Sequence, residues 1–431
     1  MKFIFFITIL TLLACSTNRP VETSQTLIHP LPVNSPEAIK KPYVLLISID
    51  GHRGDYTDRF NAPNLKKFRY EGLSATTLIP AYPSKTFPNH YSIVTGLYPE
   101  HHGIVANQFY DFTRPVKNNI YKLGLRSSVE DGSWYGGTPL WVAAEKNHML
   151  SACFFWPGSE AKIQNTRPTY YKNYDGKIPN NIRIKQIIDW LKLPETQRPH
   201  FLTLYFSDVD SIGHEYGTDS PEIKIAVEKI DEELGILFSE LKKLHLPINT
   251  IIVSDHGMVN LDKDKIIYLD DYTSFKNVKT AESGPQMFIY NHELPANVLD
   301  KIYEDLKKHE KNFKVYGREK LPKKFHFNNN ARAGDLVVIA DQPYSIGLRD
   351  SNFKIPFATH GYDPLKYKEM HAIFYAQGPQ IKKGKMPSFS NIDIYPFIKK
   401  ILDLPEDQKI DGSIKTLLPW YQTGENPTIY Q

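Results

Sequence analysis

Six short segments of this chain are almost continuously apolar instead of alternating between apolar and polar positions. They cover residues 43–50, 150–156, 201–206, 250–254, 336–339 and 372–375. Continuous apolar runs of this length are typical of strands that helices cover on both faces, as in a parallel sheet. Helical periodicity lies between them, over residues 182–191, 220–241 and 298–306. This alternation predicts an α/β fold with a mainly parallel central sheet and helices on both of its faces.

The stretch between about residues 262 and 350 interrupts this rhythm. It holds a Lys-rich helical pattern and a basic, Asn-rich run over residues 314–330. We expect a small inserted subdomain there, within one catalytic domain that covers residues 43–425. The basic run is interpreted as a solvated face, and a patch that faces phosphate is the alternative.

The first 15 residues have the pattern of an export signal. Lys2 precedes an apolar run, residues 3–13, that is shorter than the ~20 residues a membrane-spanning helix needs. The run ends at Cys15 in a Leu-Leu-Ala-Cys sequence, which resembles the signal of a bacterial lipoprotein, where the cysteine is acylated. A plain secretory signal with an incidental cysteine is the alternative. We expect a lipid-anchored protein of the cell envelope, at the outer membrane or facing the periplasm, with residues 16–42 as a disordered, Pro- and Ser-rich tether.

The net charge and the number of cysteines bear on the possible partners of the protein and on how its fold is stabilised. The 52 basic and 48 acidic residues leave a formal net charge of +4, which gives no argument for a nucleic-acid partner. The chain has two cysteines, Cys15 and Cys153. If Cys15 carries lipid, no structural disulfide is possible, and stability depends on a large apolar core that includes Cys153.

Carboxylates and histidines follow three of the predicted strands and recur in a fourth segment. These residues are Asp50, Asp210, His214, Asp255, His256 and His360. In α/β sheets, side chains just beyond the carboxyl ends of the strands form the site. Imidazole nitrogen and carboxylate oxygen are ligands of catalytic zinc, and two zinc ions about 4 Å apart can hold both reacting oxygens of a phosphate displacement. The set predicts two zinc ions with three protein ligands each.

A candidate nucleophile lies in the polar, proline-bounded loop over residues 83–90, before an apparent helix over residues 91–95. A hydroxyl at a helix start lies near unpaired N–H groups, which favour an anion. Thr86 is the expected nucleophile, and it needs a base or a metal ion for activation. Ser84 is a rival on the same pattern, and an ordinary capping threonine is the structural alternative.

Four motifs together resemble the nucleotide pyrophosphatase/phosphodiesterase family of the alkaline phosphatase superfamily. They are Lys85-Thr86-Phe87-Pro88-Asn89-His90 and the segments 95–103, 210–217 and 254–258, within a resemblance that runs from about residue 43 to beyond residue 402. The resemblance implies an alkaline phosphatase-like fold and two zinc ions per chain. Asp50, Thr86, Asp255 and His256 match the ligands of one zinc ion, and Asp210, His214 and His360 match those of the other.

The resemblance also implies a two-step mechanism. Thr86 attacks phosphorus in line, a covalent threonine intermediate forms, and water then releases the phosphomonoester from the opposite side. Asn107 matches the asparagine whose side-chain amide helps to hold a phosphate oxygen. His90, His101 and His102 match motif positions that are not metal ligands.

The substrate class is less sharply defined by the sequence. Phe87, Tyr170 and Tyr205 resemble aromatic positions that sandwich a base in nucleotide-cleaving members, so we expect hydrolysis of nucleotide phosphodiester or pyrophosphate bonds to nucleoside 5′-monophosphates. A choline-type phospholipid-headgroup phosphodiesterase, or a phosphomonoesterase, on the same bimetal site is the alternative. A non-catalytic binding lipoprotein is a third hypothesis, and the seven filled metal-site positions argue against it.

Overall fold

The computed structural model describes residues 32–295, 297–349, 355–406 and 408–424. The predicted signal over residues 1–15 and residues 16–31 of the predicted tether lie outside this part of the chain.

Residues 32–42 contain the short helix α1 (Pro36–Ile39), whose Ala38 is buried. The side-chain amide of Asn34 donates hydrogen bonds to the carbonyls of Glu195 and Arg198, at 2.9 and 2.7 Å. The tether prediction is therefore wrong for residues 32–42, because polar contacts hold them where no apolar period is present.

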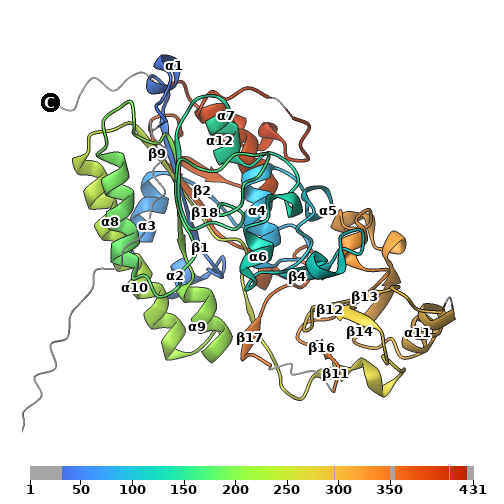
Figure 1. The fold of residues 1–431 in the computed structure, drawn as a ribbon. Coiled ribbons are helices and arrows are strands. Elements are labelled where there is room, and N and C mark those ends of the chain that lie inside the picture. The colour runs from blue at the N-terminus through green and yellow to red at the C-terminus, as the bar shows by residue number, and fades with distance from the viewer. Residues whose placement is uncertain (1–31, 296, 350–354, 407, 425–431) are drawn as a thin grey trace, which may run out of the picture. The chain divides into compact units, whose positions relative to one another are not determined.

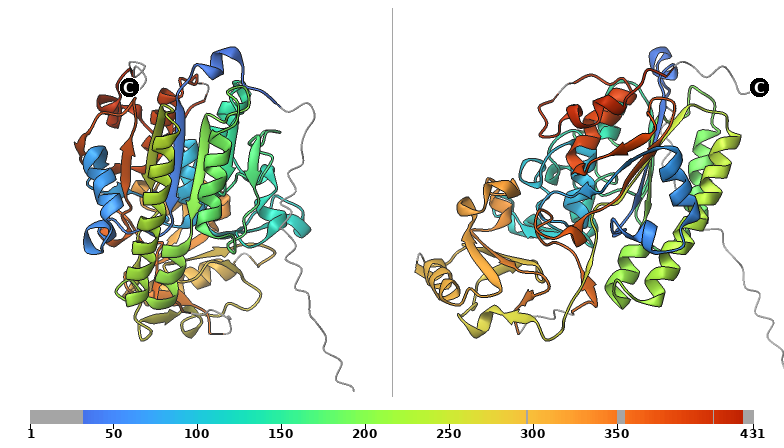
Figure 2. Two further views of the ribbon diagram at one scale, coloured as in Figure 1. Left: turned by 90° about the vertical axis from the view of Figure 1, so that its left-hand side faces the viewer. Right: turned by 180° about the vertical axis from the view of Figure 1, so that it is seen from behind.

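A sheet of eight strands forms the centre of the described chain (Figures 1 and 2). Its spatial order is β19 (Gly384–Met386), β2 (Leu73–Ala75), β18 (Phe374–Gln377), β9 (Ile248–Val253), β1 (Tyr43–Ile49), β8 (Phe201–Phe206), β6 (Ser151–Phe154) and β7 (Tyr170–Lys172). Only β18 runs against its neighbours, and it pairs antiparallel with both β2 and β9. The prediction of an α/β fold with a mainly parallel central sheet is confirmed.

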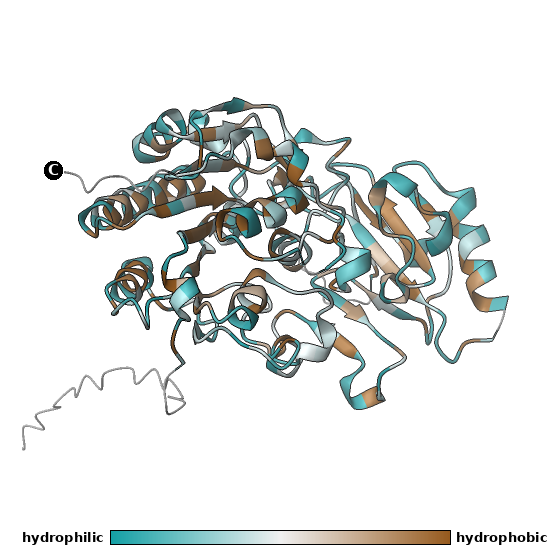
Figure 3. Cartoon of the chain, turned by 90° about the horizontal axis from the view of Figure 1, so that it is seen from above, coloured by the Kyte–Doolittle hydropathy of each residue, from teal (hydrophilic) through white to brown (hydrophobic). Residues whose placement is uncertain are grey.

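Helices cover both faces of this sheet (Figure 1). One face carries α3 (Pro63–Glu71), α8 (Asn180–Leu191) and α10 (Pro221–Lys243), and the other carries α4 (Thr86–Thr95), α7 (Leu140–Lys146) and α12 (Ile394–Ile401). Alternate residues of β1 belong to the two different cores, Leu45 to the first and Leu46 to the second. This double burial is why the strand is apolar at every position. In Figure 3 the strands of the interior are coloured as hydrophobic, whereas the helices mix both kinds of residue.

A second, antiparallel sheet lies inside the stretch that we interpreted as an insertion. Its order is β12 (Lys279–Ala281), β13 (Gln286–Tyr290), β15 (Leu336–Ala340) and β14 (Phe313–Gly317). The helix α11 (Asn297–Lys308) packs on it through Leu299, Ile302 and Leu306. The apolar run over residues 336–339 is thus a strand of this sheet and not of the parallel one.

None of the helices in the described residues is both long and apolar enough to cross a membrane. Cys153 is a buried, free thiol on β6, as its apolar surroundings predicted.

Candidate active site

The predicted metal ligands meet at the carboxyl ends of three adjacent central strands. Asp50 directly follows β1, and Asp255 and His256 follow β9. The helix α9 (Asp208–Tyr216), which carries Asp210 and His214, begins just after β8, and His360 follows β17 (Ala358–Thr359). Since the carboxyl ends of parallel strands lie at one edge of a sheet, residues that are hundreds of positions apart in the chain converge there.

Asp50, Asp255 and His256 form the first of two clusters. One ligand atom from each lies within 4.8 Å of the others. Nε2 of His256 is 2.9 Å from Oδ2 of Asp255 and 3.6 Å from Oδ1 of Asp50. The Thr86 hydroxyl lies 3.2 Å from the same Nε2, so the predicted nucleophile borders this cluster.

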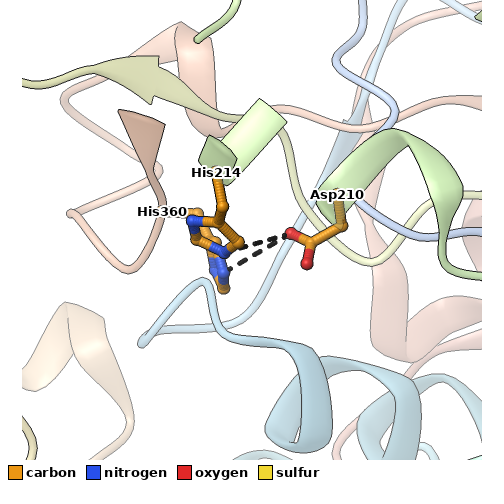
Figure 4. Close-up of side chains that lie close together, drawn as sticks. All are labelled: Asp210, His214 and His360. Carbon is orange, nitrogen blue, oxygen red and sulfur yellow. Dashed lines mark ion pairs between the residues drawn. The ribbon is translucent and has the colours of Figure 1, made fainter. Parts of the chain in front are cut away.

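Asp210, His214 and His360 form the second cluster (Figure 4). Asp210 and His214 are four residues apart on α9, which places both on one face of the helix. Oδ1 of Asp210 is 3.4 Å from Nε2 of His214 and 3.7 Å from Nε2 of His360. The rings of His256 and His360 stack with their centroids 3.5 Å apart, so the two clusters adjoin.

In each of the three histidines of the two clusters, Nδ1 lies within hydrogen-bond distance of a backbone carbonyl oxygen. Nδ1 of His214 is 2.7 Å from the oxygen of Ala358, that of His256 is 2.9 Å from the oxygen of Gly257, and that of His360 is 2.8 Å from the oxygen of Ser84. A carbonyl only accepts hydrogen bonds, so Nδ1 carries the proton and Nε2 presents its lone pair to the cluster. Metal-binding histidines are oriented in this way.

The carboxylates of both clusters have oxygen atoms that nothing in the described chain satisfies. Oδ1 of Asp50, Oδ1 of Asp210 and Oδ2 of Asp255 are buried without a hydrogen-bond partner. Burial and the nearby carboxylates of Asp255 and Asp210 raise the pKa of Asp50 well above its usual value. Such a crowd of buried carboxylates is costly unless cations offset it, and imidazole with carboxylate is a donor set that suits zinc. The two clusters therefore fit divalent cations.

Gly51 allows the two clusters to come close together. Its φ is +68°, and a Cβ atom there would lie 2.8 Å from the Cα atom of Asp210. Any other residue would push the segment after β1 away from α9, which carries two ligands of the second cluster.

Thr86 is the first residue of α4, with Lys85 as its N-cap, so the helix begins five residues before the predicted start at residue 91. Its hydroxyl therefore lies at the end of the helix that has free N–H groups. The rival Ser84 is fully buried, and its Oγ donates to the carbonyl of Tyr362 at 2.8 Å and accepts from the N–H of Gly361 at 3.2 Å. The geometry favours Thr86 as the nucleophile and gives Ser84 the task of holding the His360 segment.

Asn107 lies beside the start of the same helix. Its Oδ1 accepts a hydrogen bond from the backbone N–H of Phe87 at 3.0 Å. This bond fixes the orientation of the amide, and the Nδ2 group has no partner among the residues that the structure describes. The amide N–H can thus donate to an oxygen of a ligand, and the contact with a phosphate oxygen that the resemblance implies stays a prediction.

Two of the three aromatic residues that were expected to contact a base, Tyr205 and Phe87, lie beside the clusters in different ways. The Tyr205 hydroxyl donates to Oδ2 of Asp50 at 2.6 Å, and its buried ring lies edge-on to His90. Tyr205 therefore supports a metal ligand instead of forming a wall for a base. Phe87 is half-buried next to Thr86, with its ring edge-on to Tyr121.

Tyr170 is in the wrong place for a substrate contact. It pairs in register with Ala152, which pairs with Leu202, and Leu202 pairs with Leu45. Asp50 lies five residues beyond Leu45, just past the end of β1, or about 16 Å away at the rise of an extended strand. The Tyr170 hydroxyl donates to the carbonyl of Gln197 and its ring stacks on Trp190. It is a core residue, and the prediction that it binds substrate is wrong.

The aromatic residue that the sequence reasoning missed is Tyr174. Its side chain is 51% exposed, and its ring centroid lies 6.0 Å from that of Tyr205 and 5.1 Å from that of Phe155. The chain has three tyrosines within five positions here, and sequence alone does not show which of them passes the end of the strand. The turn residues Asp175 and Gly176, directly after Tyr174, are the signal that could have identified it.

Comparisons with known proteins identify the family of the chain. Residues 44–363 match the family model described as type I phosphodiesterase/nucleotide pyrophosphatase. The chain is 37% identical over 404 residues to a venom phosphodiesterase of Crotalus durissus collilineatus, covering 90% of this chain and 48% of the relative. It is 36% identical over 394 residues to an uncharacterized pyrophosphatase/phosphodiesterase of Schizosaccharomyces pombe, covering 87% of this chain and 80% of the relative.

Solved structures are similar over the same region. Murine ectonucleotide pyrophosphatase/phosphodiesterase 5, an inactive variant in complex with AMP, superposes with a TM-score of 0.83 at 30% identity, covering 89% of this chain and 100% of that one. The chain spans about half the length of the venom and mammalian relatives that it matches. The match of the family model over most of the chain, together with the fission-yeast relative, places the sequence without ambiguity. This chain belongs to the type I phosphodiesterase/nucleotide pyrophosphatase family.

Proposed function

We propose that this chain hydrolyses phosphodiester or pyrophosphate bonds of nucleotides to nucleoside 5′-monophosphates, with Thr86 as the nucleophile. The observation that carries the proposal is the position of the Thr86 hydroxyl. It lies at the N-terminus of α4, 3.2 Å from Nε2 of His256 and beside a cluster in which each of the two carboxylates has one buried oxygen without a hydrogen-bond partner. Membership of the family and the AMP complex of a similar protein support nucleotides as the substrate.

The clusters would hold two divalent cations, which we propose to be zinc. Asp50, Asp255, His256 and Thr86 would bind one, and Asp210, His214 and His360 the other. When bound, the cations would promote ionisation of the Thr86 hydroxyl and offset the charge that develops on the phosphoryl group.

The chain's own groups account for the remaining requirements of the reaction. The Thr86 oxygen attacks phosphorus, the bond to the leaving alcohol or phosphate oxygen breaks, and a covalent phosphothreonine diester to the nucleoside remains. In the second step water attacks this phosphorus, the bond to the Thr86 oxygen breaks, and the nucleoside 5′-monophosphate leaves. The Nδ2 group of Asn107 donates a hydrogen bond to a phosphoryl oxygen, and the N-terminus of α4 adds its partial positive charge. Phe87 and the half-exposed Tyr174 offer aromatic faces for a base, so we propose Tyr174 in the role that the sequence had assigned to Tyr170.

A paired assay tests the proposal. We expect the purified protein, chelated and then supplied with zinc, to cleave p-nitrophenyl thymidine monophosphate faster than p-nitrophenyl phosphate, and Thr86→Ala to abolish this activity. Faster cleavage of the monoester would refute the substrate class, and activity that survives the substitution would refute the nucleophile. Hydrolysis of glycerophosphocholine in preference to a dinucleotide would favour a lipid-headgroup phosphodiesterase.

We also propose that the protein is a lipoprotein of the cell envelope, acylated at Cys15. The support is the sequence pattern of residues 1–16 alone. Cys15→Ser should move the protein from the detergent-soluble membrane fraction to the soluble fraction of the expressing cells, and a variant that stays in the membrane fraction would contradict the anchor.

A further inference from the structure

A carboxylate from the second sheet reaches the segment that carries the nucleophile. Glu282 follows β12, at the turn that leads into β13. Its Oε2 lies 3.0 Å from Nζ of Lys85, and the Lys85 and Glu282 side chains are 10% and 6% exposed. Its Oε1 accepts a 2.7 Å hydrogen bond from the backbone N–H of Gln108. One buried carboxylate thus binds two separate segments of the catalytic domain.

Both of these contacts are adjacent in the sequence to residues for which we propose a direct contact with the phosphate. Lys85 precedes Thr86 and is the N-cap of α4, and Gln108 follows Asn107. The Glu282 carboxylate therefore fixes the distance between the start of α4 and the strand β4 (Gln108–Tyr110). The Phe87-to-Asn107 hydrogen bond lies between the same two segments, and its geometry depends on that distance.

The ion pair also touches the segment that carries His360. A Cβ atom added to Gly361 would lie 2.8 Å from Cε of Lys85, so the lysine stem is in close contact with this glycine. Lys85 consequently contacts parts of the chain that contribute to both clusters. Removal of its partner would leave a buried ammonium group without compensation, and such a group moves toward solvent or draws in water.

The backbone conformation of Glu282 indicates that the position of its carboxylate matters. Its φ is +64°, a left-handed conformation that residues other than glycine rarely adopt. An Asn or Gly at this position would adopt the left-handed conformation with less strain. Neither would supply the carboxylate that contacts both Lys85 and Gln108. Backbone strain of this kind tends to persist where the surroundings require one particular geometry.

We infer that Glu282 is a positioning residue for phosphoryl transfer, which holds Thr86 and Asn107 at their working separation through Lys85 and Gln108. The inference rests on the proposed function and extends it, because it makes the second sheet a working part of the active site. Glu282 touches neither the substrate nor the reacting atoms, so its effect is on the placement of the groups that do.

The test compares Glu282→Gln with Lys85→Met and with the double variant, each as the full-length, zinc-loaded protein. Glu282→Gln keeps the shape and an acceptor for Gln108 but loses the charge that holds Lys85. Because misplacement of reacting groups by about 1 Å can cost around 100-fold in rate, we expect kcat for p-nitrophenyl thymidine monophosphate to fall by roughly 10- to 100-fold, with KM changed much less. The double variant should be no slower than the slower single variant, because both substitutions break the same contact.

Asp111→Asn is the matched control. Asp111 forms an ion pair with Arg332 at 2.9 Å, with side chains 12% and 17% exposed, and this pair also joins the second-sheet region to the catalytic domain. We expect it to lower Tm by about as much as Glu282→Gln while kcat stays close to that of the wild type. An equal loss of kcat in Asp111→Asn and Glu282→Gln, or a normal kcat in both Glu282→Gln and Lys85→Met, would overturn the inference.

Calorimetric titration with AMP separates this inference from the proposed function. If Glu282 places Asn107, Glu282→Gln weakens AMP binding severalfold and Asp111→Asn does not. A wild-type protein that binds AMP but cleaves no diester would refute the proposed function, and the AMP affinities would still decide the role of Glu282. A wild-type protein that neither cleaves the diester nor binds AMP would overturn both.

Discussion

Removal of the Tyr205 hydroxyl tests whether the first cluster holds a cation as its geometry indicates. The Tyr205→Phe substitution deletes one donor and leaves the buried ring in place. The hydroxyl is 2.6 Å from Oδ2 of Asp50, the length of a hydrogen bond from a hydroxyl to a charged oxygen. It lowers the pKa of Asp50 against the raising effects of burial and of Asp255 and Asp210, so it favours the ionised form that binds a cation.

The size of the effect follows from the burial of both partners. Asp50 is 1% exposed and Tyr205 is 8% exposed, so water does not replace the lost donor. A hydrogen bond to a charged group contributes about 1.5–3 kcal/mol, which corresponds to roughly 10- to 150-fold in the affinity for the ion. Substitution of the outer partners of metal ligands usually costs about 10- to 100-fold, which is the same range.

The assay is a zinc titration of the chelated protein, followed by competition with a chromophoric chelator and by diesterase activity. We expect Tyr205→Phe to need about 10- to 100-fold more free zinc for half-maximal activity and to regain most of its kcat at saturation. Tyr174→Phe is the matched control, because its hydroxyl is 3.3 Å from Oγ of Ser207 and contacts neither cluster. Unchanged zinc affinity in Tyr205→Phe, or a loss that excess zinc does not restore, would refute the reasoning.

Three further predictions concern the base site, the charge of the clusters and their spacing. Tyr174→Ala should raise KM for nucleotide diesters by roughly 5- to 150-fold, the value of one base stack, whereas Tyr170→Phe should leave KM unchanged; equal effects in steady-state kinetics would contradict the assignment of Tyr174. Because the pKa of Asp50 is raised in the metal-free fold, that form is most stable below the usual carboxyl pKa and loses stability as the pH rises through the raised value. Chelation should therefore lower Tm more at about pH 8 than at about pH 5 in calorimetry, and the opposite order would be evidence against the carboxylate cluster. Gly51→Ala forces a side chain to within 2.8 Å of the Asp210 Cα atom at a φ of +68°, so we expect zinc to bind more weakly at the second cluster; an unchanged metal content after dialysis would contradict this.

The positions of the candidate metal ligands could be predicted from sequence because most of them follow directly after a strand. A strand buried on both faces is apolar throughout, so the first polar residue after it marks the edge of the sheet, as Asp50 does after β1. The same signal does not identify the sheet to which a strand belongs. β15 is as apolar as β1, because α11 covers one side of it and the main core the other, and it pairs antiparallel in the second sheet.

The errors arose where local sequence does not determine three-dimensional position. The sequence predicts a proline-bounded loop before a helix at residue 91, whereas α4 begins at Thr86, because a proline in the first turn of a helix needs no hydrogen-bonded N–H group. The sequence does not show that Tyr170 lies inside the sheet, because the register of β7, an edge strand of three residues, is set by pairing with β6. Glu282 lies about 200 positions from Lys85 in the sequence, and no local pattern indicates that the two meet.

The one antiparallel strand of the central sheet, β18, has a consequence for the order in which the chain can fold. β18 (Phe374–Gln377) comes near the end of the sequence and lies between β2 and β9. A nascent chain that ends before these residues also lacks β19, so β2 has no partner strand in the sheet and β9 has a free edge, and free edges pair with other molecules. A premature stop codon after His360 and before residue 374 would therefore yield material prone to aggregation even though all seven metal-site residues had been translated. Protection of the nearly complete chain by a holdase chaperone would matter most over this last stretch of synthesis.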